Sequence, residues 1–196
     1  MNFLPKAYEE DRDFWKEAAA ASRAYLHSAC HEKTGLSAEY ADYDGKPHTG
    51  HKEIFGRHDW YYSDAYRTIA NIAMDHLWFD ADPWQIKTAE RLQKFYCEDQ
   101  KDNWDGVFLI DGTPLDEKAL HPVAIIAVNA EASLAADGNM QSSVLKSSGT
   151  LRLGQVTGDT MIIFLYMFAM LALSGNLQDL LIFIYNGSGT DRLTII

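Results

Sequence analysis

Apolar side chains recur at three- and four-residue steps in several long segments, and this periodicity constrains the fold more than any other feature. In residues 11–31, Phe14, Ala18, Ala21 and Tyr25 fall on one helical face. The same periodicity predicts further helices over 63–78, 83–99 and 122–136. Helices do not alternate with strands as a parallel sheet requires, so the sequence predicts an all-α fold.

Two long segments between these helices are rich in glycine or lack a sustained period. The first is 32–59, and the second is 105–120, where a short strand is expected at 107–110. Loops of this length in a compact domain are usually functional or disordered. Because the first loop contains Tyr40 and Tyr43, we expect it to be ordered. Such loops at one end of paired helices are where an all-helical fold would build its site.

Residues 161–173 form an apolar run without a single charge. A membrane-spanning helix needs about 20 residues, which is longer than this run. The sequence therefore predicts a buried helix here and no contact with a membrane. Residues 1–6 lack the basic and apolar regions of a signal peptide, which is consistent with a cytoplasmic protein.

The net charge of −11 limits the partners of the chain. Phosphate backbones and anionic lipids carry the same sign of charge, so nucleic acid and membrane surfaces are not expected partners. Neutral ligands remain, and sugars fit. The five Trp and ten Tyr residues could stack on sugar rings, although most should fill the core.

Cysteine and histidine spacing predicts no metal site and no cofactor. Cys30 and Cys97 belong to no CxxC pair, so we expect them to be reduced, buried and structural. His51, His58 and Asp59 match no standard ligand spacing.

The densest group of chemically active side chains is the segment RHDWYYSDAYR at 57–67. Ser63 is the expected N-cap of the helix over 63–78. Asp64 then falls in the first turn, where the helix dipole favours an ionised carboxylate. An ionised carboxylate can act as a general base, although an acidic residue in this position often serves only to stabilise a helix terminus.

Several stretches of the sequence resemble one enzyme family. They are TGLSAEYADYDGKP at 34–47, YSDAYR at 62–67 followed by NIA at 71–73, LHPV at 120–123 and AEASLAAD at 130–137. In order and spacing they are similar to the reducing-end xylose-releasing exo-oligoxylanases of glycoside hydrolase family 8. The resemblance covers about residues 5–140, with a weaker match at 164–176.

The resemblance implies an (α/α)6 barrel and inverting hydrolysis of β-1,4-xylo-oligosaccharides, with Asp64 as the general base. It also implies that Leu120, His121 and Pro122 form a loop that blocks the cleft beyond the terminal xylose. Arg67 would orient Asp64 from three residues away. Other candidate substrate contacts are Trp60, Tyr61 and Tyr43.

The chain also departs from the family pattern. The family's general acid is a glutamate from an early helix, and no segment of residues 1–30 matches it. We therefore expect the C-terminal part of a barrel, incomplete and inactive alone, with family likeness over 1–176 and an atypical tail at 177–196. Residues 154–163 also depart from the pattern. Oligomeric state stays open.

Two other functions remain open from the sequence. The first is a non-catalytic or partner-dependent half barrel that binds sugars, which the missing acid would explain. The second is a family 8 endo-enzyme that acts on cellulose, xylan or chitosan. The resemblance of residues 120–122 to a cleft-blocking loop disfavours the endo-enzyme.

Overall fold

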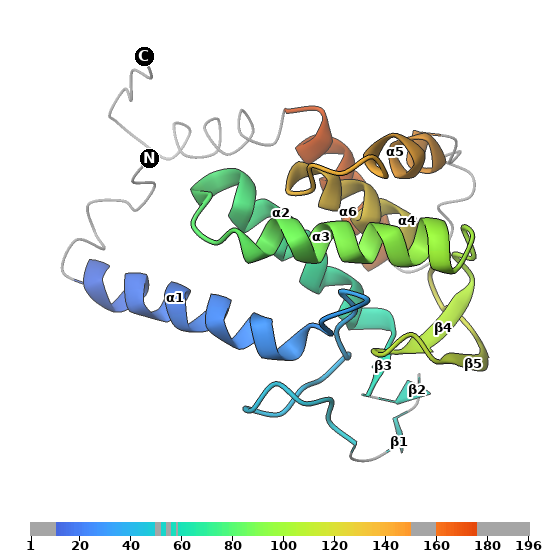
Figure 1. Cartoon of the computed structure of the whole chain (residues 1–196), viewed down its shortest axis with the longest axis horizontal. Coiled ribbons are helices and arrows are strands. Elements are labelled where there is room, and N and C mark those ends of the chain that lie inside the picture. The colour runs from blue at the N-terminus through green and yellow to red at the C-terminus, as the bar shows by residue number, and fades with distance from the viewer. Residues whose placement is uncertain (1–10, 50–51, 54–55, 58, 150–159, 176–196) are drawn as a thin grey trace.

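The computed structural model describes residues 11–49, 52–53, 56–57, 59–149 and 160–175. Six α-helices dominate these ranges, and short strands gather at one end of them (Figure 1). The helices are α1 (Arg12–Ala29), α2 (Tyr66–Phe79), α3 (Trp84–Lys94), α4 (Pro122–Glu131), α5 (Gln141–Gly149) and α6 (Thr160–Leu173). The predicted predominance of helix is confirmed.

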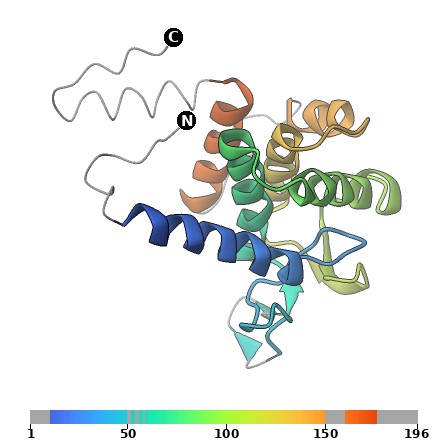
Figure 2. The same cartoon turned by 60° about the vertical axis from the view of Figure 1, so that its left-hand side comes forward.

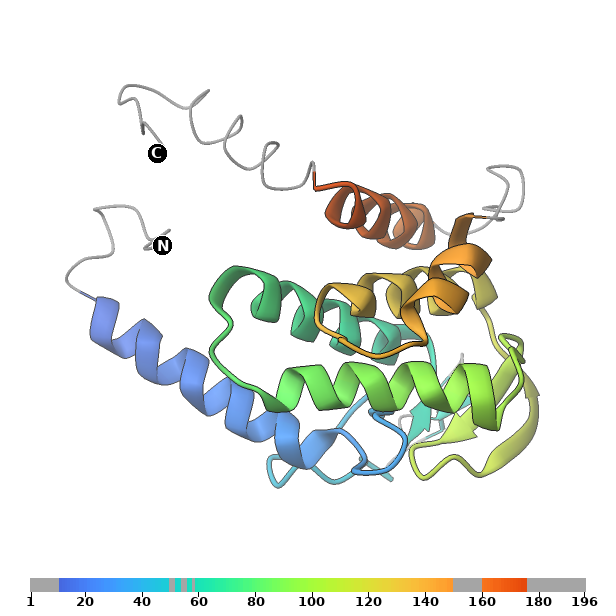
Figure 3. The same cartoon turned by 45° about the horizontal axis from the view of Figure 1, so that its top comes forward.

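Helix α4 is the centre of the core and contacts α2, α3, α5 and α6 (Figure 3). Residues 124–131 of α4 are all buried, and its small side chains at Ala124 and Ala127 let neighbouring helices approach closely. Helix α2 buries a stripe of its own in the same core, made by Tyr66, Ile69, Ala70, Ile72 and Ala73. The core therefore lies between the apolar faces of these helices, as the periodicity predicts.

Helix α1 is joined by polar contacts to the last turns of α2 and to the connection between α2 and α3. The Arg23 guanidinium donates two hydrogen bonds of 2.7 Å to the Asp75 carboxylate, a bidentate geometry that fixes orientation. His27 lies 2.7 Å from a carboxylate oxygen of Asp82 and stacks on Trp84 with ring centroids 4.3 Å apart. The first half of α1 extends away from the other helices (Figure 2).

Within the residues that the structure describes, five short strands form two antiparallel sheets. Strands β1 (Lys52–Glu53) and β2 (Gly56–Arg57) pair with each other. Strands β3 (Trp60–Tyr61), β4 (Gly106–Leu109) and β5 (Pro114–Lys118) form the second sheet in the order β3-β4-β5. Tyr61 lies opposite Phe108, and Phe108 lies opposite Pro114. The strand expected at 107–110 is thus present as β4, whereas β5 was not predicted.

Most helix predictions are confirmed, with differences at the ends. The helix over 83–99 is α3 followed by a π-helical turn (Phe95–Asp99), and that over 122–136 is α4 followed by a 3-10 turn (Ala132–Leu134). Helix α5 was not predicted. The predicted tail at 177–196 lies outside the described residues. The atypical stretch at 154–163 is described only from Thr160, where α6 begins.

The apolar run at 161–173 forms α6, but the prediction that this helix is buried is wrong for this chain. Ala169 and Ala172 are buried, whereas Ile163, Phe164, Met167 and Phe168 are between 41% and 46% exposed. The reason is that α4 covers only one side of α6. Within the described ranges, no helix combines the length and apolarity that crossing a membrane requires.

Both cysteines are free thiols, as predicted. Cys30 is buried, and desolvation raises the pKa of its thiol to about 12. Cys97 is only partly buried, which corrects the prediction for that residue.

We predict that Gly35 is required for the loop after α1. Its φ is +72°, and a Cβ at this position would lie 2.7 Å from the carbonyl oxygen of Thr88. Gly35→Ala should therefore lower the free energy of unfolding by about 1–3 kcal/mol in urea titrations. Gly149 is the control, because a Cβ there meets nothing within 4 Å. Equal effects of the two alanine variants would contradict this explanation.

Candidate active site at the start of α2

Asp64 lies in a 3-10 turn (Ser63–Ala65) that connects β3 to α2. The backbone N–H of Ala65 donates to the carbonyl oxygen of Tyr62 at 2.9 Å. Ser63 has a φ of +41°, a left-handed conformation that costs a non-glycine residue about 1–3 kcal/mol. Ser63 is therefore not the helix N-cap. That position belongs to Ala65 for α2, without a side-chain capping bond, which corrects the sequence-based prediction.

Buried tyrosines hold this turn on both sides. Tyr61 precedes it and Tyr66 follows it, with side chains only 2% and 1% exposed and ring centroids 5.1 Å apart. Tyr96 also packs against Tyr61, at 6.2 Å between centroids. Burial raises the pKa of all three phenols, so they stay neutral. Tyr61 consequently belongs to the core, and its covered ring is not available as the substrate contact for which the sequence made it a candidate.

The turn leaves Asp64 and Arg67 at the surface. Their side chains are 47% and 39% exposed, and Arg67 Nη2 forms an ion pair with Asp64 Oδ1. The i,i+3 contact expected from the sequence is therefore present. An exposed pair of this kind contributes about 0–1 kcal/mol to stability. Its main consequence is geometric, because the guanidinium restricts the directions in which the carboxylate can point.

The other aromatic candidates lie in different surroundings. Trp60 is half-buried in β3, edge-on to Tyr62 with centroids 6.2 Å apart, and its carbonyl accepts a hydrogen bond from the Glu39 N–H. It therefore adjoins the Asp64 turn. Tyr43 is fully exposed in the turn at 42–46, and the structure does not bring it into this group.

The second predicted segment, 120–122, reaches the same end of the helices. Strands β3 and β5 both run antiparallel to β4, so the chain leaves them in the same direction. Asp64 follows β3 and Leu120 follows β5. Leu120 is 43% exposed, His121 is the N-cap residue of α4, and Pro122 occupies its first turn.

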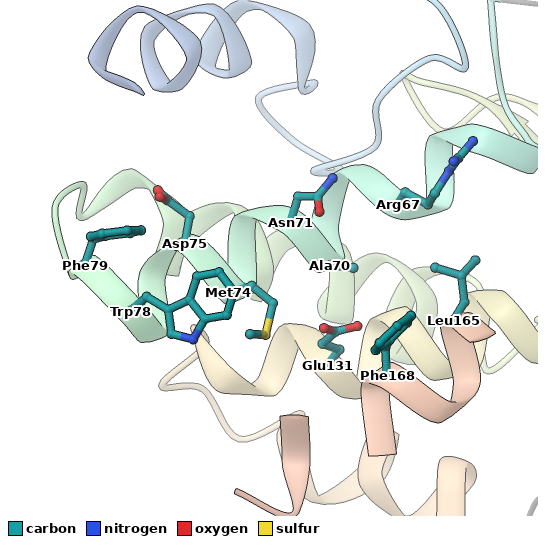
Figure 4. Close-up of a pocket in the computed structure, with 10 residues that line it drawn as sticks. All are labelled: Arg67, Ala70, Asn71, Met74, Asp75, Trp78, Phe79, Glu131, Leu165 and Phe168. Carbon is teal, nitrogen blue, oxygen red and sulfur yellow. The ribbon is translucent and has the colours of Figure 1, made fainter. Parts of the chain in front are cut away.

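A groove of about 420 Å³ runs between α2, α4 and α6 (Figure 4). Arg67 lines one end, next to Asp64, and Trp78 and Phe79 line the other. Its lining consists of Arg67, Ala70, Asn71, Met74, Asp75, Trp78, Phe79, Glu131, Leu165 and Phe168. The groove therefore connects the candidate base to the apolar surface of α6.

Glu131 is a buried carboxyl group that the sequence reading did not single out. Its side chain points into the groove (Figure 4), and the residue is only 4% exposed. No described residue gives it a hydrogen bond or an ion pair. Desolvation raises the pKa of its carboxyl to about 7. One feature of the sequence could have identified Glu131: it is the one charged residue in the mostly apolar segment AIIAVNAEASLAA at 124–136.

Metal chemistry finds no support in the described ranges, where no group of three His, Cys, Asp or Glu side chains could hold an ion. His51 and His58, whose spacing in the sequence matches no standard metal site, lie outside the described residues.

No protein-family model matches the chain, but individual relatives do. It is 48% identical over 174 residues to the reducing-end xylose-releasing exo-oligoxylanase Rex8A of Paenibacillus barcinonensis. It is 44% identical over 182 residues to a reducing-end xylose-releasing exo-oligoxylanase of Bifidobacterium adolescentis. These matches cover 89% and 88% of this chain, but only 45% and 46% of the relatives. The chain thus spans less than half the length of the curated proteins that it matches.

Solved structures give the same result. Rex8A of Paenibacillus barcinonensis complexed with xylose matches with a TM-score of 0.76 and 47% identity, over 86% of this chain and 44% of Rex8A. A variant of a reducing-end-xylose releasing exo-oligoxylanase complexed with xylobiose matches with a TM-score of 0.73 and 42% identity, over 43% of its length. The resemblance read from the sequence motifs is confirmed.

We predict that Glu131 makes the stability of the chain depend on pH. Below pH 4.5, its carboxyl is neutral in both the folded and the unfolded chain. Between pH 4.5 and about 7, the unfolded chain ionises while the folded chain keeps the proton, so stability falls as the pH rises. The total loss from this group should be roughly 3 kcal/mol, and none follows above pH 7.

Urea titrations of the wild type and Glu131→Gln across pH 4.5–8 measure this effect. The Glu131→Gln side chain cannot ionise, so the variant should not share this loss. The free energy of unfolding of the variant should therefore rise relative to that of the wild type as the pH increases. Two parallel stability curves would contradict the assignment.

Proposed function

Because the chain is homologous over most of its length to the reducing-end xylose-releasing exo-oligoxylanases, we propose that the intact protein is a glycosidase of this kind. It hydrolyses β-1,4-xylo-oligosaccharides and releases xylose from the reducing end. The observation that carries this proposal is the 48% identity to Rex8A, together with the exposed Asp64 on its strained turn. Since the chain spans less than half of its relatives, the proposal concerns the intact protein.

Asp64 acts as the general base. Its exposed carboxylate accepts a proton from a water molecule, and the water oxygen then bonds to the anomeric carbon on the face opposite the leaving group. The glycosidic bond breaks, and the leaving oxygen takes a proton from a general acid, so configuration inverts. Inversion requires roughly 6.5–9.5 Å between the two carboxyl groups to admit the water. Arg67 orients Asp64 through the ion pair.

The general acid lies outside this chain in this proposal. The family likeness predicts a glutamate from an early helix, and the relatives extend well beyond the matched part. The intact fold is an (α/α)6 barrel of the glycoside hydrolase family 8 type. Residues 1–176 form part of it, and residues 177–196 form a tail without family likeness.

Leu120, His121 and Pro122 limit the enzyme to terminal units. This segment leaves the β3-β4-β5 sheet at the same end as the Asp64 turn, and Leu120 is 43% exposed. A protruding side chain at that place closes the cleft beyond one xylose. The half-length match supports a second candidate, a sugar-binding half barrel that is catalytic only with a partner.

We predict that Asp64→Asn lowers kcat for xylotriose by about 10²–10⁴-fold in the full-length protein, with little change in KM. The amide keeps the shape of the side chain but accepts no proton from water. Asp80→Asn is the matched control, because Asp80 lies past the opposite end of α2, is 84% exposed, and asparagine tolerates its left-handed backbone. Undiminished turnover of Asp64→Asn would remove Asp64 from the role of base.

We predict that shortening the loop changes the products. The double variant Leu120→Ala, His121→Ala should release xylobiose and longer fragments from xylo-oligomers, because the cleft beyond the terminal sugar opens. Chromatography of the products measures this. If the double variant still releases only xylose, the loop does not set the exo specificity. If the wild type itself cleaves internally, the endo-enzyme alternative holds.

A further inference from the structure

The phenol hydroxyls of Tyr61, Tyr66 and Tyr96 are buried, and none has a hydrogen-bond partner among the described residues. A buried hydroxyl without a hydrogen bond is unfavourable, and buried polar side chains in folded proteins nearly always have a partner. The three oxygens are shielded from solvent within this chain. Their partner therefore has to lie inside the tyrosine cluster, and not on a surface that packs against it.

The three hydroxyls lie near one another. The ring centroids of Tyr61 are 5.1 Å from those of Tyr66 and 6.2 Å from those of Tyr96. Burial is the main cause that raises the pKa of Tyr61 and Tyr96, and repulsion by a neighbouring phenolate raises each pKa further. The Cys30 thiol also acts on Tyr61, but a thiol is a weak hydrogen-bonding group. Polar groups within electrostatic reach that do not bond directly are commonly bridged by water.

Tyr66 connects this cluster to the turn that carries Asp64. Burial raises the pKa of the Tyr66 phenol, and the backbone N–H of Ser63 lowers it. The Ser63 N–H therefore lies close to the Tyr66 oxygen, although the two are not in hydrogen-bond geometry. Ser63 is also the residue with the left-handed backbone, a conformation that persists only where the surroundings hold it. A group bound to the Tyr66 oxygen consequently acts on this turn.

We propose that the phenol oxygens of Tyr61, Tyr66 and Tyr96 bind a water molecule inside the cluster, and that this network fixes the turn that carries Asp64. Buried waters typically make about three hydrogen bonds, and the three phenols supply them. Tyr66 and Tyr96 are then positioning residues, because their buried oxygens act on the turn and not on the substrate. Their effect on turnover rests on the proposed role of Asp64, whereas the water site does not.

A crystal structure of the intact protein tests the water site directly. We expect an ordered water about 2.5–3.0 Å from the Tyr66 oxygen and from the oxygen of Tyr61 or Tyr96. Direct hydrogen bonds between the phenols, a protein group as their partner, or a dry gap between them would overturn the proposal.

Phenylalanine variants of the intact protein distinguish a bonded hydroxyl from an unpaired one. Tyr66→Phe and Tyr96→Phe each remove one hydrogen bond to the water, so the Tm of both variants should fall. If the oxygens have no partner, each variant instead removes an unsatisfied polar group, and its Tm should stay the same or rise. Such a result would overturn the water site. Either variant alone gives this reading if the other does not fold.

Turnover of xylotriose by the intact protein tests the positioning role. Tyr66→Phe and Tyr96→Phe should lower kcat about tenfold or more with little change in KM, because a displaced base slows the chemical step and not binding. Tyr25→Phe is the matched control, since the Tyr25 hydroxyl donates to backbone carbonyls at 41–42, and this variant should keep its kcat.

The outcomes separate this proposal from the proposed function. Wild-type kcat in Tyr66→Phe and Tyr96→Phe, or an equal loss in Tyr25→Phe, would overturn the positioning role. Undiminished turnover of Asp64→Asn would overturn the proposed function instead, and the crystal structure and the Tm values would still decide the water site.

Discussion

The burial of Tyr61 and Tyr66 on either side of Asp64 is the constraint on which the candidate site depends. Each ring is almost fully covered, and Tyr96 closes the cluster from the end of α3. Fully burying one such aromatic side chain contributes on the order of 2–3 kcal/mol, comparable to the cost of the left-handed backbone at Ser63. The tyrosines thereby hold a turn that would otherwise relax, and they leave Asp64 exposed between them.

The three-stranded sheet extends this constraint to the second loop. Tyr61 at the end of β3 and Lys118 at the end of β5 are far apart in the sequence. The ends of the two strands are brought near each other because both strands pair with β4. The antiparallel pairings make the two strands parallel to each other. Helices α2 and α4, which follow them, consequently begin at the same end of the core and pack against each other. A short sheet in a helical protein thus places the candidate base Asp64 and the exposed Leu120 at the same end of the core.

The sequence predicted the long helices because their apolar faces have a clear period. It singled out Asp64 because the motif around it is specific, and the role of Asp64 as general base stays a prediction. It did not predict α5, whose segment QSSVLKSSG has no apolar stripe. It misassigned Ser63, because capping preference is a local rule and the buried tyrosines outweigh it. It also placed Tyr61 among the candidate substrate contacts, since an aromatic residue in a loop motif gives the same sequence signal whether it faces substrate or core. Glu131 was missed because burial is a tertiary property.

Helices α4 and α6 show how the same pattern leads to different outcomes. Both are apolar all round, which predicts burial on every side. Helix α4 meets this expectation, because neighbours surround it and even Glu131 is buried. Helix α6 packs mainly on α4, and its outer side chains remain exposed. The amino acids of α6 are those of a helix that another surface covers.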